Sequence, residues 1–242
     1  MDKQLLDLYS DYLISSFSYT TATGLSRLTD GIISHDKVTR FLSDREYTSK
    51  DLWLQVKTLV RKIETADGVL IMDDTIEEKL YTDENDIICY HFDHTFGRTV
   101  KGVNMMSILY HNQQKTIPVS FEVVKKTKWT IDKKTGKEKR VSKETKNQMG
   151  RRMVLTCHHN QIQYRYVLAD IFFSSKENME FVKGTLKKDF IFAIKQNRLV
   201  ALSLRDKRQG IFVRVEDVTL EENTTRLVYF KGLSFSIALT KC

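Results

Sequence analysis

Two short apolar runs in the sequence end in carboxylates. The first, Val69-Leu70-Ile71-Met72, leads into Asp73, Asp74 and Thr75, and the second, Tyr164 to Ala169, leads into Asp170. An apolar run of this length, closed by polar residues, is typical of a buried strand. Two strand-end aspartates that lie side by side would hold a divalent cation, because hard ions such as Mg²⁺ prefer carboxylate oxygens. The sequence therefore predicts a metal-binding site at these strand ends.

Strand alternation separates Asp73 from Asp74. Leu70, Met72 and Asp74 share one face of a strand, and Asp73 lies on the other, so one site uses only one of them comfortably. We predict Asp74, which directly precedes Thr75, as the ligand, while Asp73 stays open as an alternative. A simpler interpretation is that these polar residues only cap a turn.

Other candidate ligands are weaker. His91 and Asp93 share a face in His91-Phe92-Asp93-His94, but His94 points away, which makes a poor zinc site. We interpret this cluster as substrate-facing or structural. The pair His158-His159 is interpreted as a helix end. Three widely spaced cysteines predict reduced thiols.

Positive charge is concentrated in one segment. Residues 125–152 hold twelve basic and three acidic residues, and the whole chain has a net charge of +8. Such a segment is often only a solvated loop, but beside a metal-binding acidic pair it is suited to a phosphate backbone. Arg98 and Lys101 lie near the acids and could also grip phosphate. The predicted contacts to double-stranded DNA are Lys37, Arg40, Arg98, Lys101, Lys125, Lys126, Lys128, Lys133, Lys134, Arg140, Arg151 and Arg152.

The elements that must position these residues form a predicted α/β fold in three parts. Residues 1–66 are expected to be helical, with Ser34 capping a helix from His35 to Leu42 whose basic outer residues are Lys37 and Arg40. This pattern fits a helix-turn-helix DNA reader or an ordinary helical bundle. Residues 67–208 are expected to form a mixed sheet flanked by helices, with a loop from Thr75 to Asp86. Residues 209–242 contain strand-like runs at 211–215, 226–231 and 233–239.

The composition excludes several classes of protein. With 41% hydrophobic residues the chain is expected to fold, and the charged N-terminus predicts neither a signal peptide nor membrane association. We expect a cytoplasmic protein.

Four segments carry a family resemblance. They are Met72-Asp73-Asp74-Thr75-Ile76-Glu77-Glu78-Lys79, His91-Phe92-Asp93-His94, Gly97-Arg98 to Lys101-Gly102, and Val167-Leu168-Ala169-Asp170. Over essentially the whole chain the sequence resembles the bacterial insertion-sequence transposases of the DDE class, in the family usually numbered four. The resemblance implies a ribonuclease H-like core, an N-terminal DNA-binding region, and two Mg²⁺ or Mn²⁺ ions held by Asp, Asp and Glu. Asp74 matches the first Asp and Asp170 the second.

The third acid is where the sequence departs from the family. The family Glu lies in a Tyr-x-x-Arg-x-x-x-Glu-x-x-x-x-x-x-Lys signature, which has no match here. We therefore expect residues 209–242 to be the start of a β-strand insertion in a C-terminally truncated copy that binds DNA but, alone, cuts it poorly or not at all. The complete enzyme is expected to cut and transfer DNA at element ends, as a possible homodimer in a synaptic complex. Two alternatives stay open: a non-catalytic remnant that occupies element ends or inhibits an intact transposase, and an unrelated metal nuclease using Glu216, Glu221 or Glu222.

Overall fold

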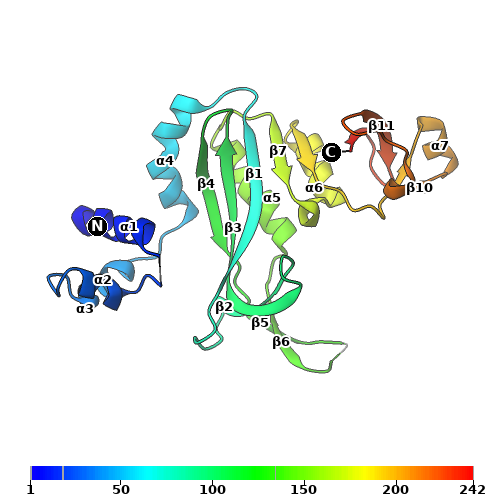
Figure 1. Ribbon diagram of the computed structural model, residues 1–242. Helices are drawn as coiled ribbons and strands as arrows, with labels where there is room; N and C mark the ends of the chain where they lie inside the picture. Colours follow the sequence, from blue (N-terminus) through cyan, green and yellow to red (C-terminus); the bar gives the residue numbers. More distant parts are fainter. Residues whose placement is uncertain (1, 18, 134, 242) are drawn as a thin grey trace. The chain divides into compact units, whose positions relative to one another are not determined.

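The computed structural model describes residues 2–17, 19–133 and 135–241. The chain divides into two compact units, Met1–Thr48 and Ser49–Cys242, which are described separately (Figure 1).

The first unit is helical, as predicted. Its helices are α1 (Lys3–Ser15), α2 (Ala22–Leu28) and α3 (His35–Leu42). The Ser34 side chain accepts a hydrogen bond from the Lys37 backbone N–H at 3.2 Å, which confirms the predicted start of α3. Tyr12, Leu25 and Val38, one from each helix, are buried together and form the centre of a small core.

The second unit begins with helix α4 (Ser49–Ile63). The Ser49 hydroxyl lies 2.7 Å from the Ser120 hydroxyl and accepts a hydrogen bond from the Phe121 backbone N–H. Trp53 and Val60 enter the main core. The boundary between the two units therefore falls between Thr48 and Ser49 in the chain, and not at the predicted residue 66. Helix α4 belongs to the second unit because its apolar stripe packs against the strand that carries Ser120.

The main sheet is mixed. Its strands are β1 (Val69–Glu78), β2 (Ile88–Asp93), β3 (Arg98–His111), β4 (Thr116–Val123), β7 (Tyr166–Ala169) and β8 (Asp189–Phe192). The order is β2-β3-β1-β7-β8. Strand β3 pairs with β2 through residues 98–103, and with β4 through residues 105–111. Strands β4, β3 and β1 are antiparallel neighbours, whereas β1, β7 and β8 run parallel (Figure 1). This confirms the predicted mixed sheet and is the ribonuclease H-like arrangement.

Helices pack against this sheet. Helix α5 (Lys146–His159) buries Met149, Met153 and Cys157. A Cβ atom at Gly150 would lie 2.4 Å from the Met72 sulfur, so a glycine here lets the helix approach β1 closely. Helix α6 (Lys176–Glu180) and a π-helical turn (Phe181–Thr185) connect β7 to β8.

Strand β1 extends further than we predicted. It continues through Glu78, where a loop was expected, because β3 pairs with it along its full length up to Gly102. A Cβ atom at Gly102 would lie 2.2 Å from the Glu77 carbonyl oxygen, which makes glycine necessary at this pairing. The acids of β1 therefore lie within a strand and not at its last residue.

The remaining elements form two smaller sheets. Strands β5 (Lys128–Ile131) and β6 (Glu138–Val141) make a two-stranded ribbon. Strands β9 (Leu199–Ala201), β10 (Val213–Arg214), β11 (Thr225–Phe230) and β12 (Ile237–Thr240) make a four-stranded sheet with the order β10-β9-β11-β12. Helix α7 (Leu204–Gln209) and the 3₁₀ turns Ile171–Phe173 and Val215–Asp217 complete the described elements. Strands β10, β11 and β12 overlap the three predicted runs after residue 209, but β10 and β12 are shorter than those runs, and β9 and α7 were not predicted.

None of the helices that the structure describes is long and apolar enough to cross a membrane.

Candidate metal centre

Strands β1 and β7 bring acidic residues to neighbouring positions. Their parallel register ends with Met72 opposite Ala169, and the next residues along the two strands are Asp73 and Asp170. Partial burial raises the pKa of the Asp73 carboxyl, and the negative charges of Asp74 and Asp170 raise it further, while a hydrogen bond from the Asp74 backbone N–H opposes them. The parallel register therefore brings Asp73 and Asp170 to neighbouring positions on adjacent strands.

Asp170 has a local role as well. Its carboxylate accepts a hydrogen bond of 3.0 Å from the Phe172 backbone N–H and caps the 3₁₀ turn that follows β7. The cap holds the carboxylate beyond the last β7 residue and leaves the acid exposed.

Asp74 faces the α5 side of the sheet, as Met72 does. Its Oδ2 atom accepts hydrogen bonds from the Asn104 amide at 2.8 Å and from the Lys146 ammonium at 2.5 Å. The side chains of Lys146 and Asp74 retain only 19% and 18% exposure. Asp74 is therefore held in a largely buried ion pair, and neither Asn104 nor Lys146 was among the predicted site residues.

The acids near the C-terminus lie in the second sheet and its turns. The Glu216 carboxylate forms an ion pair with Arg214 at 2.9 Å. The backbone of Glu222 forms an isolated parallel β-bridge with Lys241. Within the described residues, no group of three or more His, Cys, Asp or Glu side chains is arranged to hold a metal ion. The structure therefore does not gather Glu216, Glu221 or Glu222 with Asp74 and Asp170 into such a group.

The predicted histidine cluster is divided between two environments. His91 is buried, and its Nε2 atom lies 3.3 Å from the Cys89 sulfur, whereas His94 is exposed beside the Phe92 and Phe172 rings. Asp93 accepts hydrogen bonds from the backbone of Thr95 and Phe96. Of the two interpretations of the cluster, the burial of His91 favours the structural one.

His91 makes folding sensitive to acid. Burial, with the positive charges of Lys126 and Lys146, lowers its pKa from 6.5 to about 4. The unfolded chain then binds the proton more readily, so the stability that His91 contributes is complete above pH 6.5 and is lost as the pH falls toward 4. We expect His91→Gln to remove about 2 kcal/mol of the decrease in unfolding free energy between pH 7.5 and pH 5, measured by urea denaturation. His94→Gln, at the exposed histidine, should leave the decrease unchanged, and an equal effect of both variants would contradict the assignment.

Most of the predicted DNA-contacting residues already have protein partners. Arg98 pairs with Glu78, Arg140 with Asp86 and Glu84, and Arg152 with Glu122 and Glu144, while Arg151 donates to the side-chain oxygen Oδ1 of Asn178. Lys126 donates to the Tyr90 carbonyl, Lys37 pairs with Asp2, and Arg40 donates to the Asp36 carbonyl. Lys125, Lys128 and Lys133 are exposed, Lys101 is half-buried, and Lys134 lies outside the described residues.

The β5–β6 ribbon concentrates the exposed basic residues. Lys128 and Lys139 lie on one face of the ribbon, and Trp129 and Ile131 lie on the other, with 57% and 64% of their surfaces exposed. Lys139 pairs with Asp132 at 2.5 Å, whereas Lys133 and Lys137 are exposed beside the turn that joins the two strands. The Arg140 guanidinium lies 4.5 Å from the centre of the Trp129 ring. In Figure 1 the ribbon projects away from the main sheet. The alternation of polar and apolar residues in Lys128-Trp129-Thr130-Ile131 could have identified the two faces of β5 from the sequence.

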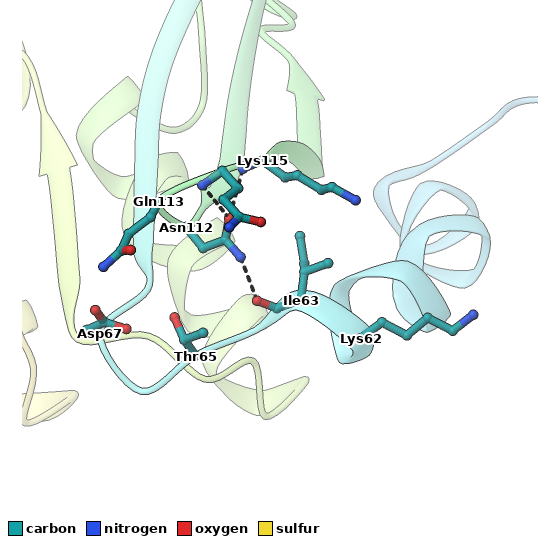
Figure 2. Close-up of a pocket in the computed structure, with 8 residues that line it drawn as sticks. Lys62, Ile63, Thr65, Asp67, Asn112, Gln113 and Lys115 are labelled. Carbon is teal, nitrogen blue, oxygen red and sulfur yellow. Dashed lines mark hydrogen bonds between the residues drawn. The ribbon is translucent and has the colours of Figure 1, made fainter.

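A pocket of about 350 Å³ lies elsewhere, beside the first residue of β1. It is lined by Lys62, Ile63, Thr65, Asp67 and residues 112–115 (Figure 2). The Asn112 amide donates to the Ile63 carbonyl oxygen at 2.8 Å across this pocket. Asp73, Asp74 and Asp170 do not line it, so this hollow is not the acidic site.

The strand order and the adjacent acids define a ribonuclease H-like α/β core with an acidic site at its centre. The chain belongs to the DDE superfamily endonuclease family, whose model matches residues 2–209. Among solved structures it is similar to the Drosophila P element transposase in a strand transfer complex, with 9% sequence identity and a TM-score of 0.31. That match covers 69% of this chain and 33% of the other, so the chain spans about a third of that transposase. No curated protein matches the sequence.

DDE superfamily endonucleases generally use divalent metal ions, and the residues here fit such an ion. The candidate donors are the hard carboxylate oxygens of Asp74 and Asp170, with Asp73 as the alternative on β1. In addition, the Oδ1 atom of Asn104 is buried and has no hydrogen-bond partner among the described residues. An unpaired buried acceptor beside a carboxylate is an arrangement that a cation would stabilise.

Proposed function

We propose that this chain carries the metal-binding and DNA-binding parts of an insertion-sequence transposase, which cuts and transfers DNA strands at element ends. The observation that carries the proposal is the parallel register of β1 and β7, which ends at Met72 and Ala169, the residues just before Asp73 and Asp170, in a chain of the DDE superfamily endonuclease family. Asp74 and Asp170 are the proposed ligands of Mg²⁺ or Mn²⁺, and Asp73 is the alternative ligand on β1. The resemblance of the segment Asp73-Asp74-Thr75 to the insertion-sequence transposases supports this assignment.

The proposed chemistry is hydrolysis and transfer at phosphodiester bonds. When bound, divalent ions would activate the attacking oxygen and stabilise the leaving oxygen. Asp74 and Asp170 would hold and orient the ions, and the Asp170 cap on the turn after β7 would keep its carboxylate in place. Because the sequence matches the first two family acids and departs from the third, we propose that the polypeptide alone cuts DNA slowly.

Double-stranded DNA at element ends and at the target is the proposed partner, with two copies paired in a synaptic complex. The exposed lysines of the β5–β6 ribbon support DNA binding, because a two-stranded β-ribbon fits the major groove and Lys side chains neutralise phosphates. Lys37 and Arg40 on α3 are the proposed contacts of the helical unit.

The experiment combines DNA binding with strand nicking. Purified chain is mixed with supercoiled plasmid in Mn²⁺, in Mg²⁺ and in EDTA, while binding of a labelled duplex is followed at several salt concentrations. We expect binding that weakens steeply with salt, and slow nicking only with metal. Plasmid nicking that is equally fast in EDTA, or DNA binding that does not depend on salt, would overturn the proposal.

A second function, a DNA-binding remnant that occupies element ends or inhibits an intact transposase, is favoured by one observation. The carboxylate of Asp74 is already neutralised by the Lys146 ammonium at 2.5 Å. Salt-sensitive DNA binding with no nicking in either metal would support the remnant over the enzyme.

A further inference from the structure

Lys146 lies between the two strands that carry the acids. Its ammonium is 2.5 Å from Asp74 Oδ2 on β1 and 5.3 Å from the centre of the Phe172 ring, which follows Asp170 by two residues. The lysine therefore places a single positive charge inside the acidic site.

The position of Lys146 in its helix is unfavourable for a cation. It is the first residue of α5, where the helix dipole presents its positive end. Helix α5 does not need this side chain for its start, because Thr145 and Gln148 form a complete capping box. The ion pair with Asp74 is the interaction that offsets this unfavourable placement.

Asn104 shares the same carboxylate oxygen. Its amide nitrogen and the Lys146 ammonium both donate to Asp74 Oδ2, while the other amide atom, Asn104 Oδ1, is buried and unpaired within the described part of the chain. Asn104 is fully buried, so its amide is held in place by the sheet. A fixed amide and a movable lysine thus hold one acid.

The geometry points to Lys146 as the built-in counter-ion of Asp74, which holds this carboxylate in the metal-free protein and leaves it when a divalent cation binds there. This inference rests on the proposed metal-binding function. Two cations cannot both approach one carboxylate oxygen in a largely buried site without strong repulsion, so Lys146 and the metal compete. Lys146 is a positioning residue, and its four-carbon side chain gives it the freedom to move away.

Removal of the competing charge should strengthen metal binding. We expect Lys146→Gln to bind Mn²⁺ at least about 10-fold more tightly than the wild-type chain, measured from the electron paramagnetic resonance signal of free Mn²⁺ during titration. The matched control is Lys143→Gln, which removes the same charge from an exposed lysine three residues away. This control should bind within about 2-fold of the wild type, because exposed charges are screened. Equal or weaker Mn²⁺ binding by Lys146→Gln would overturn the inference.

A second measurement uses the wild-type chain, in case Lys146→Gln does not fold. The chain is treated with an amine-acylating reagent with and without Mg²⁺, and each lysine is quantified by peptide mass spectrometry. We expect acylation of Lys146 to become several-fold faster with Mg²⁺, because the ammonium leaves its ion pair, whereas Lys143 should not change. Unchanged or slower labelling of Lys146 in Mg²⁺ would count against the inference.

The outcomes separate this inference from the proposed function. If the wild type and Lys146→Gln bind Mn²⁺ equally well, only the competition fails. If neither folded protein binds Mn²⁺, the metal-dependent function fails together with the competition. Binding by Lys146→Gln alone would support both.

Discussion

Asp170→Asn is expected to lower the affinity for Mn²⁺ by at least about 100-fold and to abolish metal-dependent nicking. Loss of groups that only orient a ligand typically costs 10–100-fold in metal affinity, and the loss of a ligand itself should cost no less. Asn preserves the shape of the side chain and can still cap the turn at Phe172 through its oxygen, so the fold should survive. Titration with Mn²⁺ and circular dichroism measure the two properties separately.

Control variants make this prediction specific. Asp67→Asn removes an exposed carboxylate just before β1 and should leave Mn²⁺ affinity unchanged. Asp74→Asn and Asp73→Asn then identify the partner of Asp170: the proposal expects the larger loss for Asp74→Asn. A larger loss for Asp73→Asn would move the site to the other face of β1, and an affinity of Asp170→Asn equal to that of the wild type would remove Asp170 from the site.

Neutralising the β5–β6 ribbon is expected to weaken DNA binding by about 100-fold at 0.15 M salt. The variant replaces Lys128, Lys133 and Lys137 with Gln, and each lysine that neutralises a phosphate contributes roughly 5-fold at this salt concentration through counterion release. The slope of log affinity against log salt should fall by about 3 for the same reason. Fluorescence anisotropy of a labelled 20-base-pair duplex measures both quantities.

A matched triple variant at exposed lysines away from the ribbon provides the control. Lys57, Lys195 and Lys3 are exposed and lie on α4, after β8 and on α1. Their replacement with Gln removes the same total charge and should weaken binding by much less. Equal losses in the two triple variants would show that only net charge matters and that the ribbon makes no particular contact.

Several features of the fold follow directly from local sequence patterns. The cap at Ser34 and the helix to Leu42 were predicted to the residue, because a capping hydroxyl and the apolar spacing after it act locally. The apolar run before Asp73 likewise predicted β1, and the acids at the end of two such runs predicted which strands are neighbours. These signals need no knowledge of distant residues.

Other features depend on partners that are distant in the chain. The extension of β1 past Asp74 follows from pairing with β3, and the place of α4 follows from packing on β4. The pairing of Asp74 with Lys146 joins residues 72 positions apart, so no local pattern could have identified it. The ion pairs of Arg152 with Glu122 and Glu144 could not be predicted for the same reason. Because of these pairs, fewer cations are available to DNA than the sequence suggests.

Metal-directed cleavage of the polypeptide shows directly whether β1 and β7 share one metal ion. Fe²⁺ replaces Mg²⁺ in the wild-type chain, ascorbate and peroxide generate hydroxyl radicals at the bound ion, and the cut positions are located by mass spectrometry. We expect cuts in two separate segments, around residues 72–75 and 169–172, both suppressed by excess Mg²⁺. Cuts confined to one of these segments, or clustered at residues 216–222, would contradict a site that is shared by β1 and β7.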